Sequence, residues 1–334
     1  MKQPHRRLLH WKFAFYELLL PLLRLLGPTR CDAILCTLGR VFTLLCPGRK
    51  KQLIRALQNA SDTLDLDEPV ERLWPELAAG TARSLARDCT LEGVTSRLAL
   101  DRFEVHGDDQ LRHALKNGKG AILVGSHMGA YIPALHWLFR RGLPVRALVQ
   151  RPTFISRTLS RLFDQPHESF PQAELFLRRK MPRADSVELL LRARSALQSG
   201  LALYLCGDIP WQGRNSRPAR LLGVEQPYLA IWTELAVLTR VPVFHVFCMH
   251  LPGGRFRLEI DGVGLIEPGE QAEAVADFLK HLEARIATYP AQAVAHLLWP
   301  CFHPANQGKG GSPRLHASPE SRPSRRSFAS DCRA

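Results

Sequence analysis

The spacing of apolar residues predicts that strands and helices alternate along the second part of the chain. Short apolar runs bounded by glycine or proline are typical of buried strands, and they predict strands at 120–125, 143–149, 201–206 and 242–248. A further strand is predicted at 255–260. Stretches with helical periodicity cover 131–141, 155–164, 185–199, 228–239 and 268–288. This alternation predicts an α/β fold with a mainly parallel mixed sheet flanked by helices. The turn at 251–255 predicts an antiparallel hairpin at one edge of the sheet.

The first 50 residues are more apolar and are predicted to form a helical, membrane-associated segment. Residues 8–27 are rich in leucine, but Lys12, Glu17, Pro21 and Arg24 interrupt the run that a bilayer span needs. Basic and aromatic residues in the same stretch indicate an interfacial anchor. The alternative is an ordinary amphipathic helix packed on the domain.

Composition then divides the chain into three parts. Residues 51–303 carry the α/β pattern, and residues 304–334 are basic, rich in Gly, Ser and Pro, and predicted to be disordered. The net charge is +14, and residues 1–50 hold nine Lys and Arg against two acidic residues. Because the basic balance gathers at the ends, we expect an anionic membrane surface as a partner. Neither zinc-finger spacing nor an RNA-binding aromatic motif is present, so nucleic acid is not an expected partner.

Cysteine and histidine spacing predicts neither a disulfide framework nor a metal site. The eight cysteines include no Cys-x-x-Cys pair, and several lie in apolar runs, as buried free thiols do. His245 and His250 are five positions apart on a predicted strand, and this odd offset places them on opposite faces. We therefore interpret both as structural.

The most informative candidate for chemistry is His127, which follows the predicted strand 120–125 and precedes the predicted helix 131–141. Open α/β sheets place their ligands at such strand ends. Arg151 and Asp208 also follow predicted strands, so a base, a cation and a carboxylate are expected to converge. The alternatives are a capping histidine, a solvated arginine and a turn aspartate.

Several short motifs resemble the bacterial lipid A biosynthesis acyltransferases, the lauroyl and myristoyl transferases of the lysophospholipid acyltransferase superfamily. They are 103–107, Gly118-Lys-Gly-Ala-Ile-Leu-Val-Gly-Ser-His127-Met-Gly129, Gln150-Arg-Pro152, Gly207-Asp208 and 221–227, within residues 10–300. The family motif is a histidine followed, five residues later, by Asp or Glu. This chain has Ile132 at that position, and isoleucine cannot orient or polarise an imidazole. Asp208 is the expected substitute, with Glu225 next.

The resemblance implies a membrane-associated acyltransferase on the cytoplasmic face of the bacterial inner membrane. His127 is expected to be the base and Asp208 its orienting acid, without a metal or other cofactor. The acyl donor is an acyl carrier protein or coenzyme A thioester, and the acceptor is a hydroxyl or amine of a (glyco)lipid. Expected substrate-binding residues are Gly129, Arg151, Arg178, Arg179 and Arg214, and an apolar slot is assigned to Leu221, Leu222 and Trp232. The alternative is a catalytically degenerate homologue that binds a lipid or a partner.

Overall fold

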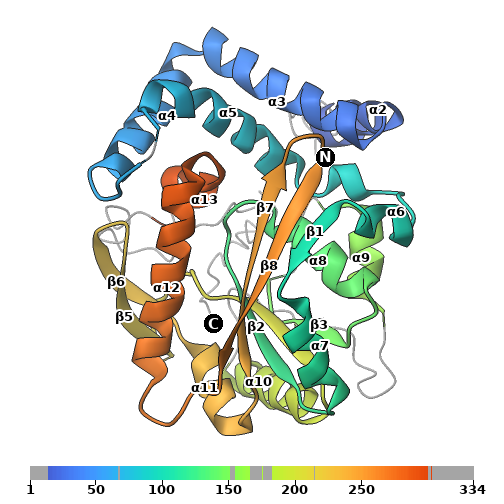
Figure 1. The fold of residues 1–334 in the computed structure, drawn as a ribbon, viewed down its shortest axis with the longest axis vertical. Coiled ribbons are helices and arrows are strands. Elements are labelled where there is room, and N and C mark those ends of the chain that lie inside the picture. Colours follow the sequence, from blue (N-terminus) through green and yellow to red (C-terminus); the bar gives the residue numbers. More distant parts are fainter. Residues whose placement is uncertain are drawn as a thin grey trace, which may run out of the picture.

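A computed structural model of the chain describes residues 14–66, 68–150, 155–165, 175, 183–213, 215–299 and 302. One six-stranded sheet lies at its centre, helices cover both faces, and the N-terminal helices cross one end of the molecule (Figure 1). The predicted α/β fold with a mainly parallel sheet is confirmed. The tail at 304–334, and its predicted disorder, lies outside the described residues.

The strand order of the main sheet is β1-β8-β7-β2-β4-β3. The strands are β1 (Phe103–His106), β2 (Ala121–Gly125), β3 (Val145–Ala147), β4 (Ala202–Cys206), β7 (Val243–Leu251) and β8 (Arg255–Gly264). Neighbouring strands run parallel, except that β7 and β8 form the predicted antiparallel hairpin. The expected edge position of this hairpin was wrong, because β1 pairs in parallel with β8 and covers its outer side.

A second, two-stranded sheet was not predicted. Strands β5 (Ser216–Leu221) and β6 (Val224–Leu229) form an antiparallel hairpin that turns at Leu222 and Gly223, both with positive φ. The Leu222 backbone N–H donates to the Glu283 carboxylate at 2.8 Å, which ties the hairpin to a C-terminal helix. The predicted helix at 228–239 begins only at Ile231, because residues 228–229 belong to β6.

Two apolar cores, one on each face of the sheet, explain why the central strands are apolar throughout. In β2, Ile122 and Val124 belong to one core, whereas Ala121 and Leu123 belong to the other. The first core is covered by helices that include α10 (Arg183–Gln198), α11 (Ile231–Thr239) and α12 (Gln271–Thr288). The second is covered by helices that include α7 (Asp108–Lys116), α8 (Tyr131–Arg140) and α9 (Arg157–Phe163). A parallel strand buried on both faces has this composition.

The N-terminal helices pack on one another across the end of the sheet (Figure 1). They are the π-helix η2 (Ala14–Leu19), α2 (Leu20–Leu25), α3 (Pro28–Leu45), α4 (Pro47–Ser61) and α5 (Val70–Ala86). The buried Asp32 on α3 accepts two hydrogen bonds of 2.7 Å from Arg83 on α5. Among the described residues, no helix alone has the length and apolarity of a bilayer span. The pair α3 and α4 meets that test only jointly, across a 105° bend.

The remaining described elements complete the end of the sheet on which the N-terminal helices lie. They are the short helices η3 (Cys89–Leu91), α6 (Ser96–Leu100), η4 (Pro290–Gln292) and α13 (Val294–Leu298). Element η4 packs against α5 and α12, and α13 packs against α4 and α5. The last described helix is thereby brought back to the carboxyl edge of β2, where Trp299 lies near His127.

Candidate active site

Strand pairing brings His127 and Asp208 together. β2 and β4 are parallel neighbours, and their last residues, Gly125 and Cys206, are paired in register. The ladder extends one step further, because the Gly207 N–H donates to the Gly125 carbonyl at 2.9 Å. His127 and Asp208 each lie two residues beyond that last pair, so they leave the sheet side by side.

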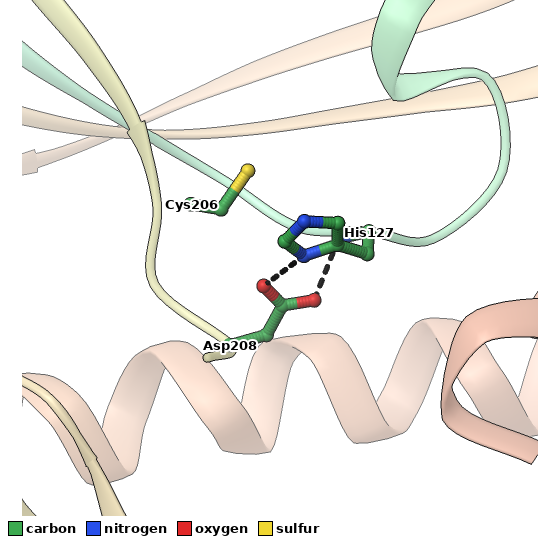
Figure 2. A group of neighbouring side chains, drawn as sticks. All are labelled: His127, Cys206 and Asp208. Atoms are coloured by element: carbon green, nitrogen blue, oxygen red, sulfur yellow. Dashed lines mark hydrogen bonds and ion pairs between the residues drawn. The ribbon is translucent and has the colours of Figure 1, made fainter. Parts of the chain in front are cut away.

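The contact between them is a hydrogen-bonded pair (Figure 2). The His127 Nδ1 lies 2.9 Å from Asp208 Oδ1, and the His127 backbone N–H donates to Asp208 Oδ2 at 2.6 Å. The Asp208 carboxylate is fully buried, whereas 20% of the His127 side chain is exposed. Since Nδ1 faces the carboxylate, Nε2 is the ring nitrogen left for a reacting group.

A second histidine, His296 on α13, also contacts Asp208. Its Nε2 lies 2.9 Å from Asp208 Oδ2, and the ring is fully buried. The carboxylate therefore has partners on both oxygens and from both histidines. Sequence reasoning missed His296 because it follows no predicted strand and lies 88 residues from Asp208.

These partners keep Asp208 ionised. Burial alone would raise the pKa of the Asp208 carboxyl, but the charge of His127 and the hydrogen bonds from His127 and His296 outweigh it. The pKa is consequently held well below its ordinary value. A fixed anion at Nδ1 orients the imidazole and stabilises positive charge on it, as the acid of a hydrolase triad does.

Aromatic rings surround the exposed side of His127. The centroids of Tyr131, Phe302 and Trp299 lie 5.1, 5.7 and 6.3 Å from the centroid of the imidazole. Tyr131 begins α8, whereas Trp299 and Phe302 follow α13. The imidazole therefore faces an apolar surface that draws on two distant parts of the chain.

A comparison with known families agrees with this arrangement. Residues 1–295 match the family described as bacterial lipid A biosynthesis acyltransferase. The chain belongs to this family. Among curated proteins, none matches the chain. An acyltransferase role is thus supported by the family, and the resemblance noted in the sequence is confirmed.

Ile132, five residues after His127, belongs to the apolar core. Its side chain is 3% exposed and packs in the core on the α8 side of the sheet. Among the carboxylates that the structure describes, the one hydrogen-bonded to His127 comes from the end of β4. The other expected substitute, Glu225, is exposed on β6.

Cys206 lies beside the same imidazole, with donor atoms of Cys206, His127 and Asp208 all within 4.8 Å of one another (Figure 2). Such a set could hold a metal ion if the thiol were deprotonated. Burial, however, raises the pKa of the Cys206 thiol well above its ordinary value, and both Asp208 oxygens already accept hydrogen bonds. The group thus fits a hydrogen-bonded dyad better than a metal centre, and the neutral thiol is a poor nucleophile.

Packing within the protein explains why position 129 is a glycine. It has a positive φ of 58°, and a Cβ there would lie 2.3 Å from the Cys248 carbonyl oxygen on β7. Its N–H donates to the Gln292 carbonyl at 3.0 Å. The glycine allows the loop that carries His127 to lie against β7, and its contact with an acyl group stays a prediction.

The remaining predicted binding residues divide into two groups. The four arginines lie outside the described residues: Arg151, Arg178, Arg179 and Arg214. In the expected apolar slot, Leu222 is half-buried, but Leu221 and Trp232 belong to the core. Trp232 is fully buried against Phe278, so its assignment to a slot was wrong.

Proposed function

We propose that the chain moves a fatty acyl group from an acyl thioester to a hydroxyl or amine of a (glyco)lipid acceptor. The observation that carries the proposal is the 2.9 Å contact between His127 Nδ1 and Asp208 Oδ1. It supplies an orienting carboxylate to a chain that has Ile132 where the acid of the resembled motif is expected. A base oriented in this way is what acyl transfer to a hydroxyl requires.

The proposed reaction uses Nε2 of His127 as the base. This nitrogen takes the proton of the acceptor hydroxyl as the oxygen attacks the thioester carbonyl carbon. The new C–O bond forms, the C–S bond of the tetrahedral intermediate breaks, and the sulfur takes the proton from Nε2 and leaves as a thiol. Asp208 stays ionised throughout and stabilises the imidazolium that forms in between.

The family resemblance favours an acyl carrier protein as donor over free coenzyme A, and the charge of the chain is compatible with it. The chain has a net charge of +14, and acyl carrier proteins present an acidic surface that suits a basic partner. For a phosphorylated acceptor, the arginines proposed to grip phosphate are Arg151, Arg178, Arg179 and Arg214. The proposed location is the cytoplasmic face of a bacterial inner membrane, held there by the N-terminal helices.

The test is acyl transfer by the full chain in lipid vesicles, with acyl carrier protein and coenzyme A thioesters compared as donors and products followed by mass spectrometry. We expect His127→Ala to abolish transfer and Asp208→Asn to reduce it about 10³-fold or more. His113→Ala, at an exposed histidine on α7, is the matched control and should leave turnover unchanged. Wild-type turnover in His127→Ala would remove His127 from the mechanism.

Ile132 favours one second candidate, a catalytically degenerate homologue that binds a lipid or a protein. This hypothesis predicts no transfer from any thioester to any lipid acceptor, and unchanged lipid binding in Asp208→Asn. Transfer by the wild type that depends on His127 would exclude it.

A further inference from the structure

His296 contacts the site from a part of the chain beyond the family match, which ends at residue 295. It lies on α13, it is fully buried, and its Nε2 is 2.9 Å from Asp208 Oδ2. The family match therefore assigns no role to His296.

The environment of His296 shows what its ring does for the protein. Within the described part of the chain, its other nitrogen, Nδ1, is buried and has no hydrogen-bond partner. Burying an unpaired polar atom is costly, and an apolar side chain of similar size would avoid that cost. The contact with Asp208 is thus the interaction that favours histidine at this position.

The two oxygens of Asp208 have different partners. Oδ2 accepts from the His127 backbone N–H at 2.6 Å and lies 2.9 Å from His296 Nε2. Oδ1 is left for His127 Nδ1, also at 2.9 Å. Because Oδ2 is held from two directions, the carboxylate cannot rotate without breaking a buried hydrogen bond. Its second oxygen therefore stays directed at the imidazole.

The segment before His296 is itself fixed to the loop that carries His127. The Gln292 carbonyl accepts from the Gly129 N–H at 3.0 Å. The Gln292 side chain accepts from the His250 N–H at 2.7 Å and donates to the His250 carbonyl at 3.0 Å. These bonds join η4, which directly precedes α13, to β7 and to the loop that carries His127, so His296 approaches Asp208 from a rigid support.

We propose that His296 is a positioning residue: it holds the Asp208 carboxylate in the orientation that aligns His127 for proton transfer. This inference rests on the proposed acyl transfer for its effect on turnover. Its effect on the hydrogen bond between Asp208 and His127 can be measured without any substrate.

The test replaces His296 in the full chain by two amide side chains of different length, glutamine and asparagine. Glutamine can place its Nε2 near the position of the histidine Nε2, whereas the amide of asparagine is too short to reach Asp208. We expect His296→Asn to lower kcat about 10–100-fold with little change in KM, as loss of a group supporting a reactive residue commonly does. His296→Gln should recover most of that loss.

The second readout is the proton NMR signal of His127 Nδ1–H in ¹⁵N-histidine-labelled protein, assigned by its loss in Asp208→Asn. We expect this signal to shift or broaden in His296→Asn and to return in His296→Gln, with both variants folded by circular dichroism. His113→Asn is the control and should not move it.

If both kcat and the NMR signal are unchanged in His296→Asn, the positioning role is wrong. Equal damage in the Gln and Asn variants, or unfolding of both, would equally overturn it, because histidine would then serve packing alone. A wild type with no transfer activity would reject the proposed function, while the NMR comparison would still decide whether His296 orients Asp208.

Discussion

The orienting acid of the proposed dyad comes from the end of a strand, whereas the motif expected from the sequence resemblance places it on a helix. The motif places it five residues after the histidine, at Ile132, on the helix that follows β2. Here the histidine-bound carboxylate is Asp208, 81 residues away in sequence and adjacent in space. What the chemistry requires is an anion at Nδ1, and the end of a neighbouring parallel strand can present one as well as a helix can.

Ionisation of Asp208 should make stability depend on pH. Its pKa is lower in the folded than in the unfolded state, so its contribution is fully present above the unfolded value of about 3.9 and is lost as the pH falls further. We expect Asp208→Asn to cost about 1–3 kcal/mol of unfolding free energy at pH 7. Denaturant titrations at pH 7 and pH 3 should show a smaller difference between the two proteins at pH 3. An equal difference at both pH values would contradict the assigned ionisation.

Burial of Ile132 predicts that restoring the family acid damages this chain. In Ile132→Glu a carboxylate would enter an apolar core while Asp208 already occupies Nδ1 of His127. We expect a loss of about 3 kcal/mol or more in the free energy of unfolding, without a gain in turnover. Ile132→Val, which keeps the site apolar, should cost about 1 kcal/mol. A stable and more active Ile132→Glu would show that the acid position still serves the site.

At the scale of elements, the N-terminal helices combine a buried contact with an exposed apolar face. Leu38, Phe42 and Leu45 are spaced along one side of α3 and are 43%, 59% and 76% exposed. On α2, Leu22 and Leu25 are 62% and 82% exposed. A contiguous apolar face of this kind is typical of a surface that meets a membrane or a partner.

The proposed membrane contact predicts that charge on this face weakens binding to lipid. Phe42→Glu combined with Leu45→Glu should lower the bound fraction in sedimentation with anionic vesicles at least severalfold, because two apolar groups are lost and two repulsive charges are added. The control is Leu238→Glu, at a residue 65% exposed on α11, at the opposite end of the molecule (Figure 1). Equal binding by all three proteins would remove α3 from the membrane contact.

Sequence patterns predicted the elements that are locally distinctive. Strands β2, β3, β4 and β7 were predicted because burial on both faces leaves a largely apolar run. Strand β8 was also predicted, although its buried apolar residues alternate with more exposed polar ones. Strand β5 carries Arg217, Pro218 and Arg220, and it gives no such run. Strand order is also absent from local patterns, so the pairing of β1 outside the hairpin could not be foreseen.

The site residues also divide into those that a local sequence pattern reveals and those that only tertiary packing reveals. His127 and Asp208 could be predicted because both follow apolar strands whose carboxyl ends meet at one edge. His296 lies on a five-residue helix without a strand before it, and only the docking of α13 reveals it. Trp232 illustrates the reverse error, since an apolar residue near a site is more often part of the core.

At the scale of the whole molecule, the site extends as far along the chain as Trp299 and Phe302, and the tail at 304–334 follows them. Truncation after Pro304 should leave the melting temperature and turnover unchanged, since the composition of the tail cannot offset an ordering cost of about 1–2 kcal/mol per residue. Truncation after Leu298 should lower turnover, because it removes Trp299 and Phe302 from beside His127. Thermal melts and acyl-transfer assays on the two truncated chains check both outcomes. A large drop in melting temperature on removal of the tail alone would show that the tail docks.

The distance in sequence between the three polar residues of the site has a consequence for synthesis. His127 is made first, Asp208 follows 81 residues later and His296 a further 88 residues later. While the chain is still on the ribosome, the base exists without the group that holds its acid, and α13 is the last described helix to emerge. Because a domain generally folds as a unit, competence for proton transfer would arise only when α13 has emerged and packed against the rest of the site. A translation product that stops before α13 would therefore contain His127 and Asp208 but not His296, and its base would not be aligned.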